Sequence, residues 1–264
     1  ESSYRKGGAS ASINGESISK EAVMNKLHRL EFPVLKTAEK KELRTLYIDA
    51  DEDHVALQYL EKKGDIRKPR INTVMPWIIY VYEGVEGDEE GRPRLINPRY
   101  FGGVYDGQEA ASRLWTEVLE YLDEAYDLDA VERIYINGDG AAWIRTGEKI
   151  IPKSKFALDK YHMHKYIIAA TSHLEDSAED AMGEIYRAIH RKKKWMAEGT
   201  FERIIGITDK ETKRKAVEQA KAYMLGNWSG IMIAMKSGDS NVRCSAEGHV
   251  SHVYADRMSS RPLG

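Results

Sequence analysis

A short apolar run that ends in an aspartate between two glycines constrains this chain more than any other stretch. Residues 134–136 are Ile-Tyr-Ile, and the run stops at Asn137-Gly138. This pattern predicts a buried strand. Asp139 follows directly, so we expect its carboxylate at the carboxyl end of a strand, where open α/β sheets place their chemistry. An ordinary strand-to-loop turn explains this stretch equally well, so the other carboxylates have to be considered with it.

Composition and charge exclude several classes of protein. The 264 residues suffice for one large domain or two small ones. Basic residues number 40 and acidic residues 42, so any basic, nucleic-acid-binding surface would have to be local. The single cysteine, Cys244, excludes an internal disulfide and indicates a reducing compartment, so we expect the cytoplasm. No apolar run approaches the ~20 residues that span a membrane. The chain starts at Glu1 without methionine, as expected of a segment of a longer protein.

Residues 1–43 predict a short helical segment and a linker. Asn14-Gly15 predicts a break between two helices, and the second helix is expected to begin at Ser19, a good N-cap. Two short helices around a glycine turn, the second of them basic, are typical of part of a helix-turn-helix. We slightly prefer a plain helical hairpin. Residues 33–43 predict the linker into the next unit.

The next strand carries a run of acidic residues. Residues 46–48 and 55–57 favour a strand, and between them lie four acidic residues that include Asp49, Asp51 and Asp53. Alternation along a strand puts these three aspartates on one face. Burying several carboxylates costs free energy unless a cation neutralises them, and a divalent metal ion would do so. A solvated acidic turn is the alternative for this stretch taken alone.

The following pattern predicts an α/β layer. Residues 71–82 and 94–105 predict two strands of a hairpin around a polar turn at 84–91. Residues 108–126 predict an amphipathic helix, because apolar side chains recur at helical spacing. Residues 148–158 predict a fifth, shorter strand. We therefore expect an antiparallel meander that feeds parallel strands within residues 44–170, which is the order of an RNase H-like fold.

Asp159 stands where a strand pattern gives way to a helical one. His162 lies three residues further on, so both side chains are expected on one face of the first helical turn. An N-capping aspartate beside structural histidines is the preferred interpretation. A metal ligand at His162 or His164 is the alternative.

Residues 171–238 predict a highly charged helical insertion. Basic residues interleaved with aromatic ones suit phosphate contact and base stacking. A solvated helix face is the alternative interpretation. The candidates for DNA contact are Arg191, Lys192, Lys193, Lys194, Trp195 and Trp228.

Residues 239–264 predict a last core helix with an acidic residue near its middle. Glu247 is followed by Gly248, and a glycine inside a helix costs ~1 kcal/mol relative to alanine. That glycine is explained if another group must approach Glu247 closely. An aspartate of the first strand, Asp139 and Glu247 would then supply three carboxylates, which can hold two Mg²⁺ ions for phosphodiester chemistry.

Four motifs carry a resemblance to a known family. They are L-Y-I-D-A-D-E-D-H-V-A-L-Q (46–58), I-N-G-D-G-A-A-W-I (136–144), F-A-L-D-K-Y-H-M-H-K (156–165) and C-S-A-E-G-H-V-S-H-V-Y-A-D-R-M (244–258). In this order they resemble the DDE transposases of bacterial insertion sequences, in the Mutator-like branch and, within it, the ISLre-type family. The Asp-x-x-His of the third motif and the helical insertion before the last one also match that branch. The resemblance covers nearly the whole chain.

The resemblance implies an RNase H-like catalytic core that uses two Mg²⁺ or Mn²⁺ ions. Such a core cleaves DNA at the element ends and joins the freed 3′-hydroxyl to target DNA. The implied metal ligands are Asp51, Asp139 and Glu247. Asp49 is the alternative to Asp51 as the first ligand, and Asp159 with His162 would support the site. In similar enzymes a tryptophan of the insertion lies near the DNA end, a role that either Trp195 or Trp228 would fill.

The implied partners are DNA, as transposon ends and as target, and further copies of the chain in a homodimer or a larger assembly. No membrane partner is expected. Two other functions fit the residues. One is a metal-dependent nuclease on the same fold that does not join DNA strands. The other is a DNA-binding relative whose site has lost activity.

Overall fold

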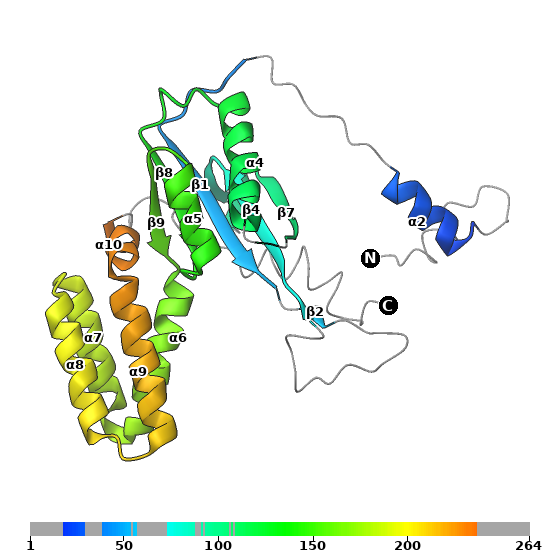
Figure 1. Ribbon diagram of the computed structural model, residues 1–264. Coiled ribbons are helices and arrows are strands. Elements are labelled where there is room, and N and C mark those ends of the chain that lie inside the picture. The colour runs from blue at the N-terminus through cyan, green and yellow to red at the C-terminus, as the bar shows by residue number, and fades with distance from the viewer. Residues whose placement is uncertain are drawn as a thin grey trace. The chain divides into compact units, whose positions relative to one another are not determined.

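The computed structural model describes residues 18–29, 39–53, 55–56, 73–87, 91, 93–105, 107 and 109–236 (Figure 1). The chain divides into two compact units, residues 1–39 and 40–264. In the first unit, helix α2 spans Lys20–His28. Ser19 caps it, because its hydroxyl accepts a hydrogen bond from the backbone N–H of Ala22 at 3.1 Å. The predicted N-cap is confirmed, whereas the helix predicted before it lies outside the described residues.

Five strands form the central sheet of the second unit. They are β1 (Thr45–Glu52), β4 (Pro76–Tyr82), β7 (Arg99–Val104), β8 (Arg133–Gly138) and β9 (Ser154–Leu158). Their order in the sheet is β7-β4-β1-β8-β9 (Figure 1). β1 pairs antiparallel with β4 and parallel with β8, β4 pairs antiparallel with β7, and β8 pairs parallel with β9. The predicted meander feeding parallel strands is therefore confirmed as a mixed sheet.

Two short antiparallel ladders lie outside this sheet. They are β2 (Val55–Ala56) with β3 (Thr73–Val74), and β5 (Gly84–Gly87) with β6 (Pro93–Ile96). The prediction of a polar turn over all of residues 84–91 is therefore wrong in part, because residues 84–87 continue the hairpin as a strand. Val85 and Leu95 explain the difference, since both pack against apolar side chains of the central sheet.

One face of the sheet is covered by helices α4 (Ala110–Ala125) and α5 (Ala142–Ile150). Leu46, Ile48 and Ala50 alternate along β1 and are fully buried on this face. The two helices approach one another closely at Gly147, where an added β-carbon would lie 2.6 Å from the ring of Trp115. The helix predicted over residues 108–126 is confirmed as α4.

The fifth strand is shorter than the sequence predicted. Residues 148–150 complete α5, and β9 begins at Ser154 after a turn in which Lys153 has a φ of +56°. Ile150 and Ile151 both pack into the core. Their hydropathy therefore does not distinguish the end of a buried helix from the start of a buried strand.

Tyrosines line the opposite face of the sheet. The ring of Tyr47 stacks on that of Tyr82 at 5.4 Å and on that of Tyr135 at 5.9 Å, measured between ring centroids. Tyr80 is fully buried on the same face. Because side chains alternate along a strand, this face of β1 also carries its aspartates.

After β9 the chain forms a series of helices. They are α6 (Lys160–Thr171), a 3-10 helix η1 (Ser172–Ser177), α7 (Ala178–His190), α8 (Lys194–Ile207), α9 (Glu211–Gly226) and α10 (Trp228–Lys236). Helices α6 to α9 pack in sequence, and α9 closes on α6 to make a bundle (Figure 1). The predicted insertion begins at residue 171, whereas the packing already includes α6.

Helix α10 returns the chain to the sheet. It packs against β9, and a β-carbon added to Gly230 would lie 2.7 Å from the ring of Phe156. The predicted last core helix, residues 239–264, lies outside the described residues. Within the residues that the structure describes, no helix combines the length and the apolar character needed to cross a membrane.

Candidate active site

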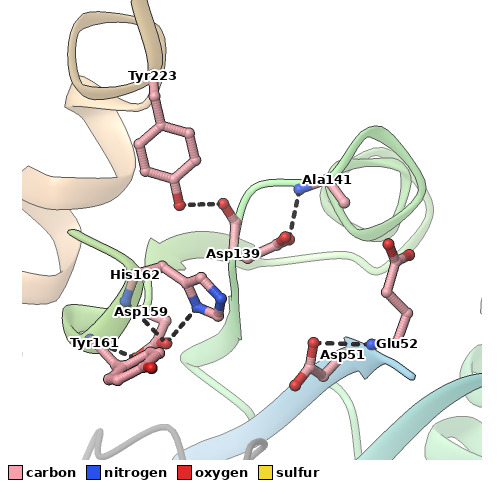
Figure 2. Close-up of polar contacts among 8 residues, drawn as sticks. All are labelled: Asp51, Glu52, Asp139, Ala141, Asp159, Tyr161, His162 and Tyr223. Atoms are coloured by element: carbon pink, nitrogen blue, oxygen red, sulfur yellow. Dashed lines mark hydrogen bonds and ion pairs between the residues drawn. The ribbon is translucent and has the colours of Figure 1, made fainter. Parts of the chain in front are cut away.

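Two aspartates lie at the carboxyl ends of neighbouring parallel strands. Asp51 is near the end of β1, and Asp139 follows the last residue of β8 (Figure 2). The strand register pairs Asp49 with Asn137. Asp51 and Asp139 each lie two residues further along, so they come level on one face of the sheet. Both are partly exposed, which leaves their carboxylates accessible to a ligand.

The carboxyl group of Asp51 has an unusual electrostatic environment. Its pKa is raised from 3.8 to about 6, mainly by burial and in smaller part by the negative charge of Asp139. The backbone N–H of Glu52, which donates to Asp51 at 2.8 Å, and the charge of His162 act in the opposite direction. Asp51 is thus ionised at neutral pH at a cost in free energy that a bound cation would offset.

A tight turn fixes Asp139. Its carboxylate accepts a hydrogen bond from the backbone N–H of Ala141 at 2.8 Å (Figure 2). Gly140 has a φ of +92°, a conformation that favours glycine. At Gly138 an added β-carbon would lie 2.9 Å from the carbonyl oxygen of Ala50. The two glycines around Asp139 are therefore required by the backbone, which gives the carboxylate a fixed direction.

Asp159 and His162 lie at the junction of β9 and α6. Asp159 caps the helix, because its carboxylate accepts hydrogen bonds from the backbone N–H groups of Tyr161 at 3.1 Å and His162 at 3.4 Å. The same carboxylate contacts Nδ1 of His162 at 2.8 Å (Figure 2). The predicted N-cap is confirmed.

The side chain of His162 is favoured in its protonated form. Its hydrogen bond with Asp159 raises its pKa, burial opposes that effect, and the charges of Asp159, Asp139 and Asp51 raise the pKa further. These acidic neighbours therefore favour a positive charge on the imidazole beside the acidic pair.

The two aspartates of β1 differ sharply in their surroundings. Asp49 is fully buried, and its carboxylate accepts hydrogen bonds from the hydroxyls of Tyr80 and Tyr82 at 2.8 and 3.1 Å and from the amide of Asn137 at 2.6 Å. Both carboxylate oxygens of Asp49 are therefore hydrogen-bonded, within the face of the sheet that the tyrosines line. Asp51, which is partly exposed beside Asp139, is the better candidate for a metal ligand.

Glu52 is directed away from this acidic pair. Its carboxylate accepts a hydrogen bond from the indole N–H of Trp143 at 2.7 Å, on the face of the sheet that the helices cover. The ring of Trp143 in turn stacks on that of Trp77, with 4.6 Å between centroids. By this alternation along β1, Asp51 and not Glu52 lies on the face of Asp139.

The donors of the described site suit a hard divalent cation. Asp51 and Asp139 offer carboxylate oxygens, the ligands that Mg²⁺ and Mn²⁺ prefer. Within the described residues, no group of three His, Cys, Asp or Glu side chains is close enough to hold a metal ion. Glu247, the third predicted ligand, lies outside those residues. The described residues thus bring two carboxylates together, and a metal centre of the predicted kind would need at least one more ligand.

The predicted DNA-contacting residues of the insertion fall into two groups. Trp195 is 69% exposed, whereas Trp228 packs against the core. All four basic candidates are exposed in and just after the turn between α7 and α8: Arg191, Lys192, Lys193 and Lys194. Trp195 follows them in the first turn of α8, so it completes an exposed basic and aromatic cluster, which we call the basic turn (residues 191–195).

The basic turn lies at the end of the bundle that adjoins the sheet. Lys221 near the end of α9 contacts Glu198 and Glu202 of α8. The start of α8 is therefore level with the end of α9, where α9 meets the Asp139 turn. Trp195 fits the predicted contact with DNA better than Trp228 does, because its ring is accessible.

Two residues that the sequence did not single out as functional contact the Asp139 turn. The hydroxyl of Tyr223 in α9 donates a hydrogen bond to the carbonyl oxygen of Asp139 (Figure 2). The side chain of Asn227 lies against Gly140. Burial and the charge of Asp139 raise the pKa of Tyr223, so the hydroxyl keeps its proton. In the sequence Asn227 is a turn residue and Tyr223 one of many half-buried helical residues, so no local signal identified them.

Comparison with known proteins places these features in a family. The chain is 41% identical to a UPF0236 protein of Caldanaerobacter subterraneus subsp. tengcongensis over all of its own length and 52% of that protein. A second UPF0236 protein of the same bacterium is 39% identical over 94% of this chain and 50% of the relative. The chain thus spans about half the length of the curated relatives it matches. The names of these two relatives cover eleven and four gene loci, respectively.

The comparison with solved structures gave a weaker result. The NurA nuclease from Sulfolobus solfataricus aligns with 72% of this chain and 45% of its own, at 12% identity and a TM-score of 0.16. A TM-score of this size does not indicate a shared fold. The family model described as Uncharacterised protein family (UPF0236) matches residues 1–264, and the chain therefore belongs to that family.

Proposed function

We propose that this chain is the catalytic core of a transposase, which cleaves DNA at the ends of an insertion sequence and joins them to target DNA. The observation that carries the proposal is the placement of Asp51 and Asp139 at the ends of two adjacent parallel strands. Carboxylates in this arrangement are suited to metal-dependent phosphodiester chemistry.

The architecture supports an RNase H-like core for this enzyme. Three antiparallel strands, β1, β4 and β7, precede a helix and the parallel strands β8 and β9. That is the order which the resemblance to DDE transposases implies. A helical bundle follows the last strand and precedes the segment that contains Glu247. The sheet, the helical bundle and the segment with Glu247 thus follow one another in the same order as the motifs that carry the resemblance.

The copy number of the relatives gives independent support. One relative has a name that covers eleven loci in a single bacterium, and another has a name that covers four. A gene inside an element that moves itself accumulates at many positions of a genome. Multiple loci are therefore expected for a transposase, whereas an ordinary housekeeping nuclease has no reason to occur in eleven.

The chemistry assigns distinct roles to the acidic residues. Asp51, Asp139 and Glu247 are the proposed ligands for two Mg²⁺ or Mn²⁺ ions. When bound, such ions activate a water or a 3′-hydroxyl and stabilise the leaving oxygen of the phosphodiester. Asp51 must be ionised to bind a cation, a condition that its pKa of about 6 satisfies at neutral pH. The Ala141 N–H orients Asp139.

Asp159 and His162 have a supporting role in this proposal. Protonation of His162, which the raised pKa favours, balances part of the negative charge beside Asp51 and Asp139. Asp159 holds that imidazole in place through the contact with Nδ1. The pair thereby limits mutual repulsion of the carboxylates before substrate and cations bind.

DNA is the proposed partner, and the basic turn is its proposed contact outside the acidic pair. Four exposed cations in residues 191–194 would contact phosphates, and the exposed ring of Trp195 would stack on a base. We further propose that the protein acts in the cytoplasm, as a homodimer or larger assembly on paired element ends.

A cleavage and joining assay tests the proposal. Full-length protein would be incubated with labelled DNA from the element ends, a target plasmid and Mg²⁺ or Mn²⁺, and the products separated on a denaturing gel. We expect cleaved and joined products from wild type and neither from Asp51→Asn, Asp139→Asn or Glu247→Gln, because the ligands act as one unit. Asp123→Asn, which removes an exposed carboxylate of α4, is the matched control and should stay active.

Two outcomes would change the assignment. Cleavage without joined products would indicate a metal-dependent nuclease. Failure of the wild-type protein to cleave or to bind Mn²⁺, together with retained DNA binding, would indicate a DNA-binding relative with an inactive site.

A further inference from the structure

The end of helix α9 contacts the turn that carries Asp139 at two points. Tyr223 donates its hydroxyl hydrogen bond to the carbonyl oxygen of Asp139, as Figure 2 shows. One turn further along, the side chain of Asn227 lies so close to Gly140 that an added β-carbon there would be 2.7 Å from its Oδ1. Helix α9 thereby holds the Asp139–Gly140 peptide by a hydrogen bond and lies against the α-carbon of Gly140.

These contacts act on the backbone that aims the carboxylate. Gly140 has a φ of +92°, and its neighbour Ala141 donates its N–H to the carboxylate of Asp139 at 2.8 Å. A rotation about the Cα–C bond of Asp139 would break the bond from Tyr223 and would also move the following Gly140–Ala141 peptide, whose N–H orients the carboxylate. The direction of the Asp139 side chain thus depends on the position of α9.

Tyr223 is itself firmly held. Its ring stacks on that of Tyr166 in α6, with 3.8 Å between centroids and 17° between planes. Asn227 donates from its side-chain amide to the carbonyl oxygen of Tyr223 at 3.1 Å. Asp159 caps the same helix α6, so the bundle holds Asp139 through α9 and the Asp159–His162 pair through α6.

The attachment of the bundle to the sheet does not explain the hydroxyl of Tyr223. Helix α10 already joins the two parts by packing Gly230 on Phe156. A phenylalanine at position 223 would stack on Tyr166 equally well. The hydroxyl therefore makes one specific contribution, which is to hold the carbonyl of Asp139.

We propose that Tyr223 and Asn227 are positioning residues that set the direction of the Asp139 carboxylate for cation binding. This inference rests on the proposed function in one respect, since it takes Asp139 to be a metal ligand. It adds that the helical bundle is part of the metal centre and that its packing determines how tightly the centre binds cations.

The test compares Tyr223→Phe with Tyr186→Phe in the full-length protein. Tyr186 is the matched control, because its hydroxyl also makes one hydrogen bond, with His164 at 2.7 Å in place of Asp139. Mn²⁺ binding would be measured by calorimetry without DNA. We expect Tyr223→Phe to bind Mn²⁺ about 10- to 100-fold more weakly, the usual effect of removing a partner that orients a ligand. Tyr186→Phe should bind like wild type.

DNA cleavage at increasing Mn²⁺ gives a second readout. In Tyr223→Phe the half-saturating Mn²⁺ concentration should rise, while the rate at saturating Mn²⁺ recovers most of the wild-type value. A general loss of structure would instead lower that maximal rate. Asn227→Ser serves as a second variant on the same turn, and it carries the test if Tyr223→Phe melts well below Tyr186→Phe.

The outcomes separate this inference from the proposed function. Wild-type Mn²⁺ affinity in both Tyr223→Phe and Asn227→Ser would overturn the positioning role, provided that Asp139→Asn abolishes binding. If the wild-type protein neither binds Mn²⁺ nor cleaves DNA, the proposed function fails and the positioning role fails with it. Weaker binding in the two variants with an unaffected Tyr186→Phe supports the inference.

Discussion

The carboxylates of Asp51 and Asp139 lie on neighbouring parallel strands, and the charge of Asp139 helps to raise the pKa of Asp51 to about 6. Without a bound cation, ionising both carboxylates in the folded protein therefore costs free energy. Such a cost is expected of a binding site, because a bound cation would offset the repulsion between the two charges. The electrostatic interaction of Asp51 and Asp139 can be measured without DNA.

The first prediction concerns stability and pH. The pKa of Asp51 is higher in the folded protein than its ordinary 3.8, so ionisation between about pH 4 and pH 6 favours the unfolded chain. Asp51→Asn should therefore raise the free energy of unfolding of the metal-free protein at pH 8, by about 1–3 kcal/mol. Near pH 4 it should have little effect. Urea unfolding at both pH values checks this, and an equal effect at both would contradict it.

The second prediction separates Asp49 from Asp51. Asp49→Asn places an amide against the donors of Tyr80, Tyr82 and Asn137, so the free energy of unfolding should fall by about 2–3 kcal/mol. Mn²⁺ binding by the remaining folded protein should persist. Denaturant unfolding and calorimetry measure the two effects. Loss of Mn²⁺ binding in Asp49→Asn with unchanged stability would assign the ligand to Asp49 instead.

The third prediction concerns the pair at the start of α6. Asp159→Asn retains a good N-cap but loses the charge beside the imidazole, so helix stability should be kept while the pKa of His162 falls. Because that pKa is raised in the folded protein, its stabilising effect is present below pH 6.5 and is lost as the pH rises through the folded value. NMR titration of His162 measures the change. Asp159→Ala should in addition cost about 1 kcal/mol through loss of the cap.

The fourth prediction tests the packing of α10 on the sheet. Gly230→Ala would put a β-carbon 2.7 Å from the ring of Phe156, so it should lower the free energy of unfolding by about 1–3 kcal/mol. Gly183→Ala in α7 is the control, because no atom lies within 4 Å of the added carbon. That substitution should be neutral or stabilising by up to ~1 kcal/mol. Thermal unfolding distinguishes the two, and equal effects would contradict the packing.

Features that depend on neighbouring residues could be predicted from the sequence. The strand before Asp139, helix α4 and the cap at Asp159 all follow from local periodicity or from one side chain bonding the adjacent backbone. The boundary between α5 and β9 could not be predicted, because the isoleucines there are buried in either conformation. Local patterns state which residues are buried, and a short apolar run fits both a helix end and a strand.

Features that depend on contacts between distant residues could not be predicted from the sequence. Alternation placed Asp49 and Asp51 on one face. It could not show that tyrosine hydroxyls from β4 donate hydrogen bonds to Asp49, or that Asp51 stays partly exposed. The bond from Tyr223 to Asp139 joins residues 84 positions apart. Such contacts follow from how the bundle packs, which no periodicity encodes.

The bundle leaves the sheet and returns to it at almost the same point. It departs after Leu158, and Gly230 comes back so close that an added β-carbon would lie 3.2 Å from the backbone nitrogen of Leu158. An excursion whose two ends meet can lengthen, shorten or be exchanged during evolution while the sheet keeps its strand order. Members of this family could therefore diverge in the bundle, and with it in the proposed contact of residues 191–195 with DNA, as long as each new version still places a donor over the carbonyl of Asp139.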